Sequence, residues 1–130
     1  MRRISLILCL FVLLSLALAA CGGGAGDDTG AVIEDYIQAL ANKDEAAIST
    51  ASCAEWEEMA LLELDAFQAV ETRLEGLSCS EVSREGDTAQ VSCEGTLIAT
   101  YNEEDQDFPL SGRIYQLERE DGEWRVCGYR

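Results

Sequence analysis

The sequence predicts an α+β fold in which three N-terminal helices pack on a curved, four-stranded antiparallel sheet. Two observations predict it. Apolar residues recur at helical spacing up to about residue 76 and alternate at strand spacing after it. Turn residues then divide the second half into strands that follow one another closely along the chain. Helices that precede the strands, rather than alternating with them, are typical of an α+β roll.

The first two helices are short and carry clear start signals. Asp28 or Thr29 can cap the first helix, and Asp44 can cap the second. The first helix has one apolar face at i, i+3, i+4 and i+7 spacing. This face consists of Ile33, Tyr36, Ile37 and Leu40.

A third, longer helix is expected over residues 55–74. Ser52 and Glu55 match a capping box at its start, and Gly76 stands where a C-cap is expected. Its apolar stripe consists of Trp56, Ala60, Phe67, Val70 and Leu74, widened by Met59, Leu62 and Ala66. A helix of this length would span about 30 Å.

Four strands follow. Residues 77–83 and 88–101 form a hairpin around a three-residue loop, and Gly95 marks a bulge or bend in the second strand. Residues 108–110 lead into a third strand, and Asp121-Gly122 predicts a two-residue turn into the fourth. The expected cross-strand pairs of this last hairpin are Arg119 with Trp124, Leu117 with Val126 and Tyr115 with Gly128.

The loop 102–107 is acidic, which suggests calcium, but it fails the EF-hand test. Asp107 stands where that motif needs glycine, and Arg113 stands where it needs glutamate. We therefore expect a solvated hairpin loop. Four cysteines without close CxxC pairs also argue against zinc, and the sequence predicts no metal or cofactor site.

Two disulfides are expected among Cys53, Cys79, Cys93 and Cys127. Centring the first hairpin on Gly86 places Cys79 opposite Cys93, within bonding range. The long third helix would hold Cys53 and Cys79 at opposite ends, which leaves Cys53 to pair with Cys127.

The N-terminus carries an export signal. Arg2 and Arg3 precede an apolar run that ends in Leu18-Ala19-Ala20-Cys21, and this ending resembles the lipobox of bacterial lipoprotein precursors. The resemblance implies that residues 1–20 are a signal peptide cleaved between Ala20 and Cys21. Acyl chains on Cys21 would then anchor the protein to the cell membrane or outer membrane, on the extracytoplasmic face. Residues 21–29 would form the lipidated cysteine and a Gly-rich tether. An uncleaved membrane anchor and an ordinary secretory signal are the alternatives.

The charge balance excludes one class of partner. Cleavage would remove Arg2 and Arg3 and none of the 25 acidic residues, so the net charge would change from −16 to −18. A surface of this charge repels phosphate backbones, and we expect no nucleic-acid binding.

Three stretches carry a family resemblance: residues 32–40 followed by Asp44, residues 86–91, and residues 120–127. Over residues 30–130 the chain resembles small bacterial lipoproteins with a nuclear transport factor 2-like domain, which is a cystatin-like α+β roll. The resemblance implies a cone whose open end can bind a small apolar molecule. It also supports the Cys53–Cys127 pairing and makes Cys79–Cys93 an addition.

The candidate lining of such a pocket is mainly aromatic. It consists of Tyr36, Trp56, Glu63, Phe67, Tyr101, Tyr115 and Trp124. Aromatic residues at these spacings are also typical of a filled core, and Trp56 with Trp124 are large enough to close the cone.

Glu63 is the one candidate for chemistry. It lies on the stripe of the third helix, where burial would raise its pKa and suit it to proton transfer. An ion pair with Arg73 or another arginine is the alternative. The chain has no histidine, and it has no P-loop, Gly-x-Ser-x-Gly or HExxH motif. We therefore expect a non-catalytic domain that binds a small apolar ligand or an envelope protein. A small isomerase or dehydratase and a purely structural envelope module are the alternatives.

Overall fold

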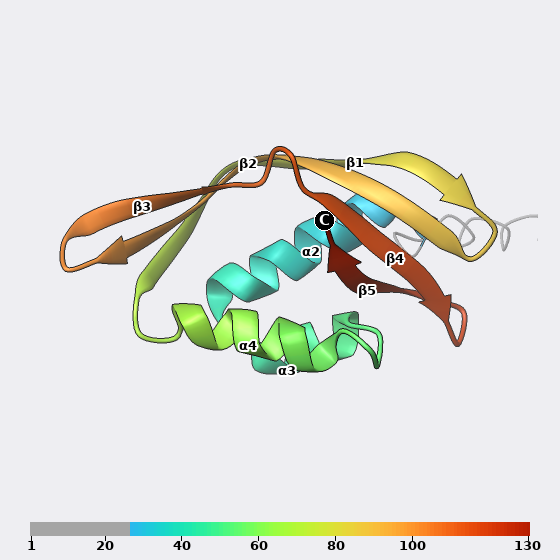
Figure 1. Ribbon diagram of the computed structural model, residues 1–130, viewed down its shortest axis with the longest axis horizontal. Coiled ribbons are helices and arrows are strands. Elements are labelled where there is room, and N and C mark those ends of the chain that lie inside the picture. Colours follow the sequence, from blue (N-terminus) through green and yellow to red (C-terminus); the bar gives the residue numbers. More distant parts are fainter. Residues whose placement is uncertain (1–26) are drawn as a thin grey trace, which may run out of the picture.

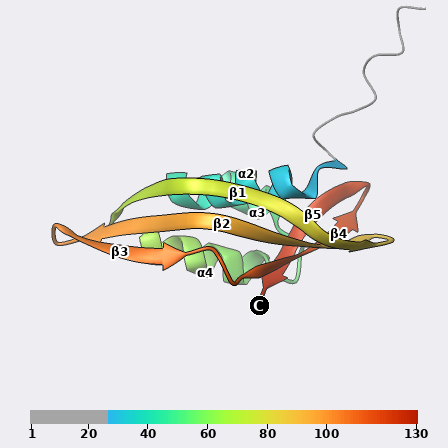
Figure 2. The same cartoon turned by 90° about the horizontal axis from the view of Figure 1, so that it is seen from above.

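The computed structural model describes residues 27–130. A strongly curved antiparallel sheet lies over three helices, with α2 against its concave side and α3 and α4 beneath (Figures 1 and 2). The predicted signal peptide, Cys21 and most of the tether lie outside the described residues. The helices are α2 (Thr29–Asn42), α3 (Glu45–Ala51) and α4 (Glu57–Phe67). The strands are β1 (Glu71–Glu85), β2 (Thr88–Tyr101), β3 (Glu104–Pro109), β4 (Ile114–Glu120) and β5 (Glu123–Tyr129).

The sheet has five strands in the order β1-β2-β4-β5, and β3 also pairs with β2. The long strand β2 therefore has β1 along one edge and two partners on the other: β4 beside residues 88–92, and β3 beside residues 96–101. This arrangement confirms the predicted α+β class.

The first two helices form as the sequence predicts. The Asp28 side chain accepts a hydrogen bond from the Ala31 amide, and Asp44 does the same for Ala47, so each satisfies a free amide at a helix start. The expected face of α2 is buried: Ile33, Tyr36, Ile37 and Leu40 are at most 4% exposed. These side chains pack against the inward-facing residues of β2, which include Ala89, Val91, Cys93 and Leu97.

The predicted third helix over 55–74 is wrong in its extent. Helix α4 covers only Glu57–Phe67, it has no side-chain cap, and Ser52 bonds the Ile48 carbonyl instead of a capping box. Beyond the helix end the burial alternates from residue to residue, with Thr72 and Leu74 facing inward. The strand β1 takes over because this segment also fits a period of two, and pairing it with β2 satisfies the backbone of both strands.

Two other corrections concern the strands. Glu85 pairs with Thr88, so the first hairpin has a two-residue turn instead of the expected three-residue loop. Residues 104–109, taken as loop and lead-in, form β3 after a tight turn in which Asn102 and Glu103 both have positive φ. Asp105 of this strand binds Arg73 at 2.8 Å. Gly95 lies at the expected irregularity, where the β1 backbone approaches it closely.

The last hairpin follows the predicted register except at its end. Arg119 pairs with Trp124 and Leu117 with Val126, but Tyr115 faces Tyr129 because the register shifts by one residue. Gly128 sits at this bulge with a φ of 120°, and its missing side chain leaves room for the Trp56 ring.

Both expected cysteine pairs lie at disulfide distance. The Cα atoms are 5.3 Å apart for Cys53–Cys127 and 4.1 Å apart for Cys79–Cys93. Two disulfides in a domain of this size indicate an oxidising, extracytoplasmic environment. Within residues 27–130, no helix combines the length and the apolar character needed to cross a bilayer.

Candidate functional site

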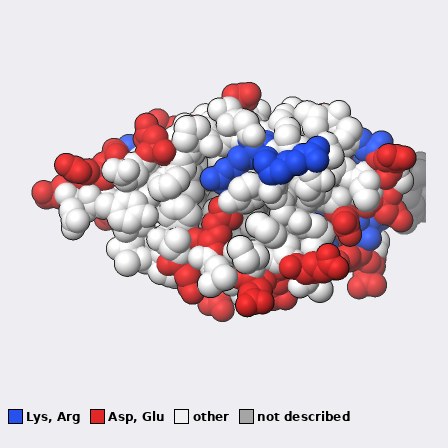
Figure 3. Space-filling view, in the orientation of Figure 1, with Lys and Arg blue, Asp and Glu red and all other residues white. Residues whose placement is uncertain are grey.

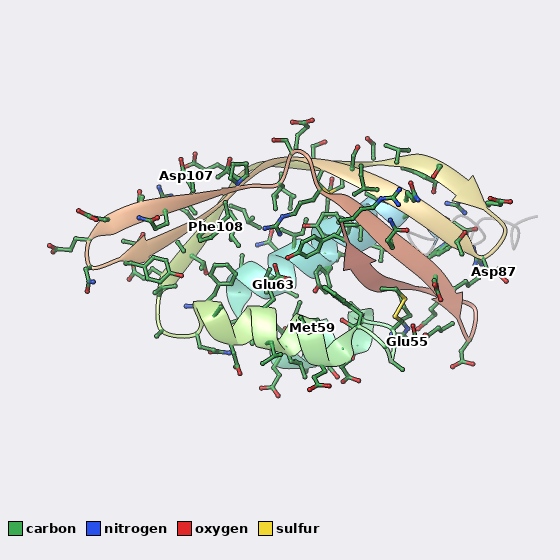
Figure 4. All side chains as sticks on the ribbon, viewed as in Figure 1. Glu55, Met59, Glu63, Asp87, Asp107 and Phe108 are labelled. Atoms are coloured by element: carbon green, nitrogen blue, oxygen red, sulfur yellow. A yellow bond between two sulfur atoms is a disulfide. The ribbon has the colours of Figure 1, made fainter. Side chains whose placement is uncertain are left out.

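The candidate site is built around Glu63, whose side chain projects from α4 toward the sheet (Figure 4). Strands β4 and β5 bring three further groups to it: Arg113 just before β4, Tyr115 in β4 and Tyr129 at the end of β5. The helical side contributes Tyr36 from α2 and Trp56 just before α4. We call these six residues the Glu63 cluster.

The Glu63 carboxylate is held on one side only. Oε1 accepts a hydrogen bond from the Tyr129 hydroxyl at 3.1 Å and lies 3.5 Å from Nη1 of Arg113. Oε2 is buried and has no hydrogen-bond partner among the described residues. Buried polar atoms are nearly always paired, so an unpaired carboxylate oxygen marks a place where a partner is missing.

Aromatic rings surround this carboxylate. The Trp56 indole nitrogen donates to the Tyr36 hydroxyl at 3.2 Å, and the Trp56 ring stands edge-on to Tyr129 with centroids 5.8 Å apart. The Tyr129 ring also packs against Tyr115, with centroids 5.4 Å apart. The Arg113 guanidinium lies over the Tyr129 ring, 4.5 Å from its centroid. The cluster is therefore an aromatic shell around one acid and one base.

Burial shifts the acid–base properties of the cluster. Desolvation raises the pKa of the Glu63 carboxyl, and the Tyr129 hydroxyl and Arg113 offset only part of this shift. Desolvation also raises the pKa of Tyr115 to about 12 and moves the pKa of Tyr36 and of Tyr129 upward. The tyrosines therefore stay neutral at ordinary pH, and Glu63 is the acidic group of the cluster whose protonated form burial favours.

The rim next to Glu63 is apolar and accessible. Met59 and Leu62 on α4 are 52% and 57% exposed, unusually high values for side chains of this type. Met59 lies one turn before Glu63 on the same helix face (Figure 4). An accessible apolar rim beside a half-buried ion pair is an arrangement that can hold an amphipathic small molecule.

Only part of the predicted pocket lining gathers at this site. Tyr36, Trp56, Glu63 and Tyr115 are brought together, with Trp56 packed against them instead of standing free. Phe67 packs edge-on against Phe108, 5.5 Å away. Two other candidates also lie elsewhere. These are Tyr101, at the far end of β2, and Trp124, which is flanked by Arg84 and Arg119.

Sequence reasoning missed Arg113 and Tyr129. The general alternative of an ion pair with an arginine is confirmed, but the partner is Arg113 instead of Arg73, which binds Asp105. The available signal was the last hairpin, because its register places the start of β4 beside the end of β5. Ile114 and Arg130 exchange two backbone hydrogen bonds there.

An open pocket of about 370 Å³ lies away from the Glu63 cluster, at the N-terminal end of α4. Its lining consists of Ser49, Thr50, Ser52, Ala54, Glu57, Glu120 and Arg125. Donor atoms of Cys53, Cys127 and Glu120 lie within 4.8 Å of one another nearby. Both sulfurs are joined in a disulfide, so they are not available as metal ligands in this form of the protein.

Comparison with known proteins gave solved structures only; no family model and no curated protein matches the chain. A protein with a cystatin-like fold from Novosphingobium aromaticivorans, itself described as NTF2-like, superposes with a TM-score of 0.56 at 15% identity. That match covers 95% of this chain and 84% of the other. This chain has the NTF2-like fold.

Two other solved structures superpose on this domain over most of its length. A SEC-C motif protein from Rhodopseudomonas palustris has a TM-score of 0.55 at 16% identity, over 79% of this chain and 77% of the other. A putative ketosteroid isomerase from Shewanella frigidimarina has a TM-score of 0.53 at 14% identity, over 76% and 89%. At these identities the likeness establishes the fold alone, and the function has to be argued from the site.

Proposed function

We propose that this NTF2-like domain is a lipid-anchored, extracytoplasmic module that binds a small, largely apolar molecule at the Glu63 cluster. The observation that carries the proposal is Oε2 of Glu63, which is buried without a partner on a helix that also exposes Met59 and Leu62. Leaving such an atom unpaired costs roughly 1–3 kcal/mol, and a bound molecule that pairs with it removes this cost.

The anchoring part of the proposal is supported by the sequence motif at Cys21 and by the two disulfides. Replacing Cys21 by Ala should move the protein from the membrane fraction to the soluble fraction or leave it as an uncleaved precursor. The N-terminal peptide of the unaltered protein should carry the added mass of acyl chains. An unmodified Cys21 would contradict this part without touching the ligand site.

The ligand part is tested by native mass spectrometry of the mature protein extracted from its own membrane. We expect a retained small molecule. Met59→Asp should abolish its retention, because the substitution places a charge on the apolar rim. Ala46→Asp adds the same charge at an exposed position of α3 and should leave retention unchanged. Absence of any retained molecule, or equal retention in both variants, would contradict the proposal and favour an envelope-protein partner or a purely structural module.

A second candidate function is an isomerase or dehydratase that uses Glu63 as acid and base. Burial raises the pKa of this carboxyl above its usual range, a direction that favours a proton donor, and the fold occurs in a protein described as a putative ketosteroid isomerase. Turnover of a 3-ketosteroid probe that is lost in Glu63→Gln would establish this function for that substrate class. Binding of the probe without turnover would favour the non-catalytic proposal.

A further inference from the structure

We propose that the molecule bound at the Glu63 cluster is an organic acid, whose carboxylate pairs with Arg113 and takes a hydrogen bond from protonated Glu63. One proton is taken up from solvent as the acid binds. This inference rests on the proposed function and specifies the chemical class of its ligand.

Arg113 forms only a long ion pair. Four other arginines each hold a carboxylate oxygen at 2.7 or 2.8 Å. These are Arg73, Arg84, Arg119 and Arg125. Arg113 instead stands 3.5 Å from Glu63, and its guanidinium stacks over the Tyr129 ring. The guanidinium also faces the Tyr115 side chain. A ligand carboxylate would compete with these contacts for the guanidinium N–H groups, whose planar arrangement matches a carboxylate in a two-bond geometry.

The positive charge at this site stands out on an acidic protein. Acidic side chains are spread over the face seen in Figure 3, and one band of basic side chains crosses its middle. The Arg130 backbone pairs with Ile114 next to Arg113, but its side chain reaches Gln90, which lies between the inward-facing Ala89 and Val91 and so faces away from the cluster. Its only side-chain contact among the described residues is the Gln90 amide oxygen at 3.5 Å. Arg113 is therefore the cation that an anion at the Glu63 cluster would meet.

The unpaired Oε2 of Glu63 explains the proton. Two carboxylates in contact cannot both stay ionised, so a ligand carboxylate beside Glu63 drives one of them to protonate. A proton on Oε2 turns this unpaired atom into a donor toward the ligand, while Oε1 keeps the Tyr129 hydroxyl. The other groups that face Glu63 are Tyr36 from α2, Tyr115 from β4 and Tyr129 from β5. Burial keeps these tyrosines neutral, so they do not supply the proton.

The test uses three probes that share one apolar body: 4-phenylbutanoate, 4-phenylbutanol and 4-phenylbutylamine. Each is titrated calorimetrically into the mature protein in lipid nanodiscs, with empty nanodiscs as the blank. Titration in buffers of different ionisation enthalpy counts the protons. We expect 4-phenylbutanoate to bind at least about tenfold more tightly than the alcohol or the amine, a factor that corresponds to about 1.4 kcal/mol. Above the pKa of Glu63, we expect uptake of about one proton and an affinity that falls about tenfold per pH unit.

Variants locate the effect. Arg113→Met should weaken 4-phenylbutanoate binding at least about tenfold. Arg113→Lys keeps the charge but loses the planar guanidinium, so its affinity for 4-phenylbutanoate should lie between those of Arg113→Met and the unaltered protein. Glu63→Gln should keep the binding but abolish the proton uptake, because the amide N–H₂ can donate where protonated Oε2 would. Arg73→Met, which removes an arginine already paired with Asp105, is the matched control and should bind normally.

Several outcomes would overturn the inference. They are equal binding of the alcohol, binding of 4-phenylbutanoate without proton uptake, and an Arg113→Met variant that folds and binds normally. If the alcohol or the amine binds and the acid does not, the ligand site stands and the acid assignment fails. If no probe binds and native mass spectrometry finds no retained molecule, the proposed function fails as well.

Discussion

Removing the two disulfides one at a time should reveal very different contributions to stability. The Cys53–Cys127 bond closes a segment with a sequence separation of 74, and the Cys79–Cys93 bond one of 14. In the chain-entropy model these loops correspond to roughly 4.5 and 3 kcal/mol. Replacing Cys53 and Cys127 together by Ala should therefore cost about 1.5 kcal/mol more than replacing Cys79 and Cys93 together.

The structure adds a reason to expect this order. The shorter bond joins neighbouring residues of a β1–β2 pairing that also has an extensive ladder of backbone hydrogen bonds. The longer bond fastens the segment before α4 to β5, where the Cys53 amide donates to the Val126 carbonyl at 2.9 Å. Urea unfolding of both double variants, followed by circular dichroism, measures the free energy of unfolding of each. An equal cost, or a larger cost for the hairpin bond, would refute the loop-length reasoning.

Three further predictions concern single side chains. Because burial raises the folded-state pKa of Glu63, protonation of this carboxyl stabilises the folded state. This stabilisation is fully present below the unfolded carboxyl pKa of about 4.3. It is lost as the pH rises through the folded-state pKa of Glu63. Urea unfolding across this range should show the unaltered protein losing stability relative to Glu63→Gln as the pH rises, and a constant difference would contradict the burial. Gly128→Ala should lower the melting temperature more than Gly112→Ala does: both have positive φ, but only at Gly128 would the new methyl carbon meet an indole ring, 3.2 Å away. Equal decreases in melting temperature would mean that the Trp56 ring moves aside at no cost in stability. Asp28→Ala should cost about 1 kcal/mol through the lost helix cap, while Asp35→Ala on the exposed face of α2 should cost much less, and urea midpoints that do not separate would show that the cap is unimportant.

The sequence predicted the fold class because its two periodicities are clear in most of the chain. It failed over residues 69–74, where Val70 and Leu74 fit both a helical stripe and an alternating strand. Local pattern cannot separate these two states, and pairing of this segment with β2 decides between them. The acidic strand β3 was not predicted, because most of its residues are exposed and show no apolar alternation. Its strand conformation depends on pairing with β2, which the local sequence does not reveal.

The pairing of Cys79 with Cys93 was predicted correctly, although the turn of the first hairpin was predicted one residue too long. The first hairpin turns between Glu85 and Thr88, which by itself would move Cys79 one residue away from Cys93. A bulge restores the expected register, because Glu81 faces Val91 while Ser83 faces Gln90, so Val82 is the extra residue. Sequence reasoning had no signal for this bulge, and both errors cancel at the cysteines.

The helical half of the candidate site was predictable, and of its strand half only Tyr115 was predicted. Glu63 and Trp56 stood out because they interrupt or enlarge an apolar stripe. Arg113 and Tyr129 lie 50 and 66 residues away from Glu63 along the chain, and only the curved sheet brings them to it. The position of Tyr129 also depends on the register shift at Gly128, which sequence reasoning did not predict because it paired Tyr115 with Gly128.

A carbon-detected NMR titration of the Glu63 side-chain carboxyl, with and without 4-phenylbutanoate, measures most directly whether this carboxyl is the centre of a binding site. We expect a pKa above the ordinary glutamate value in the free protein and a further rise when the probe is present. The carboxyl signals of exposed Asp65 on the same helix should not respond to the probe. An ordinary pKa for Glu63 that the probe leaves unchanged would contradict the account.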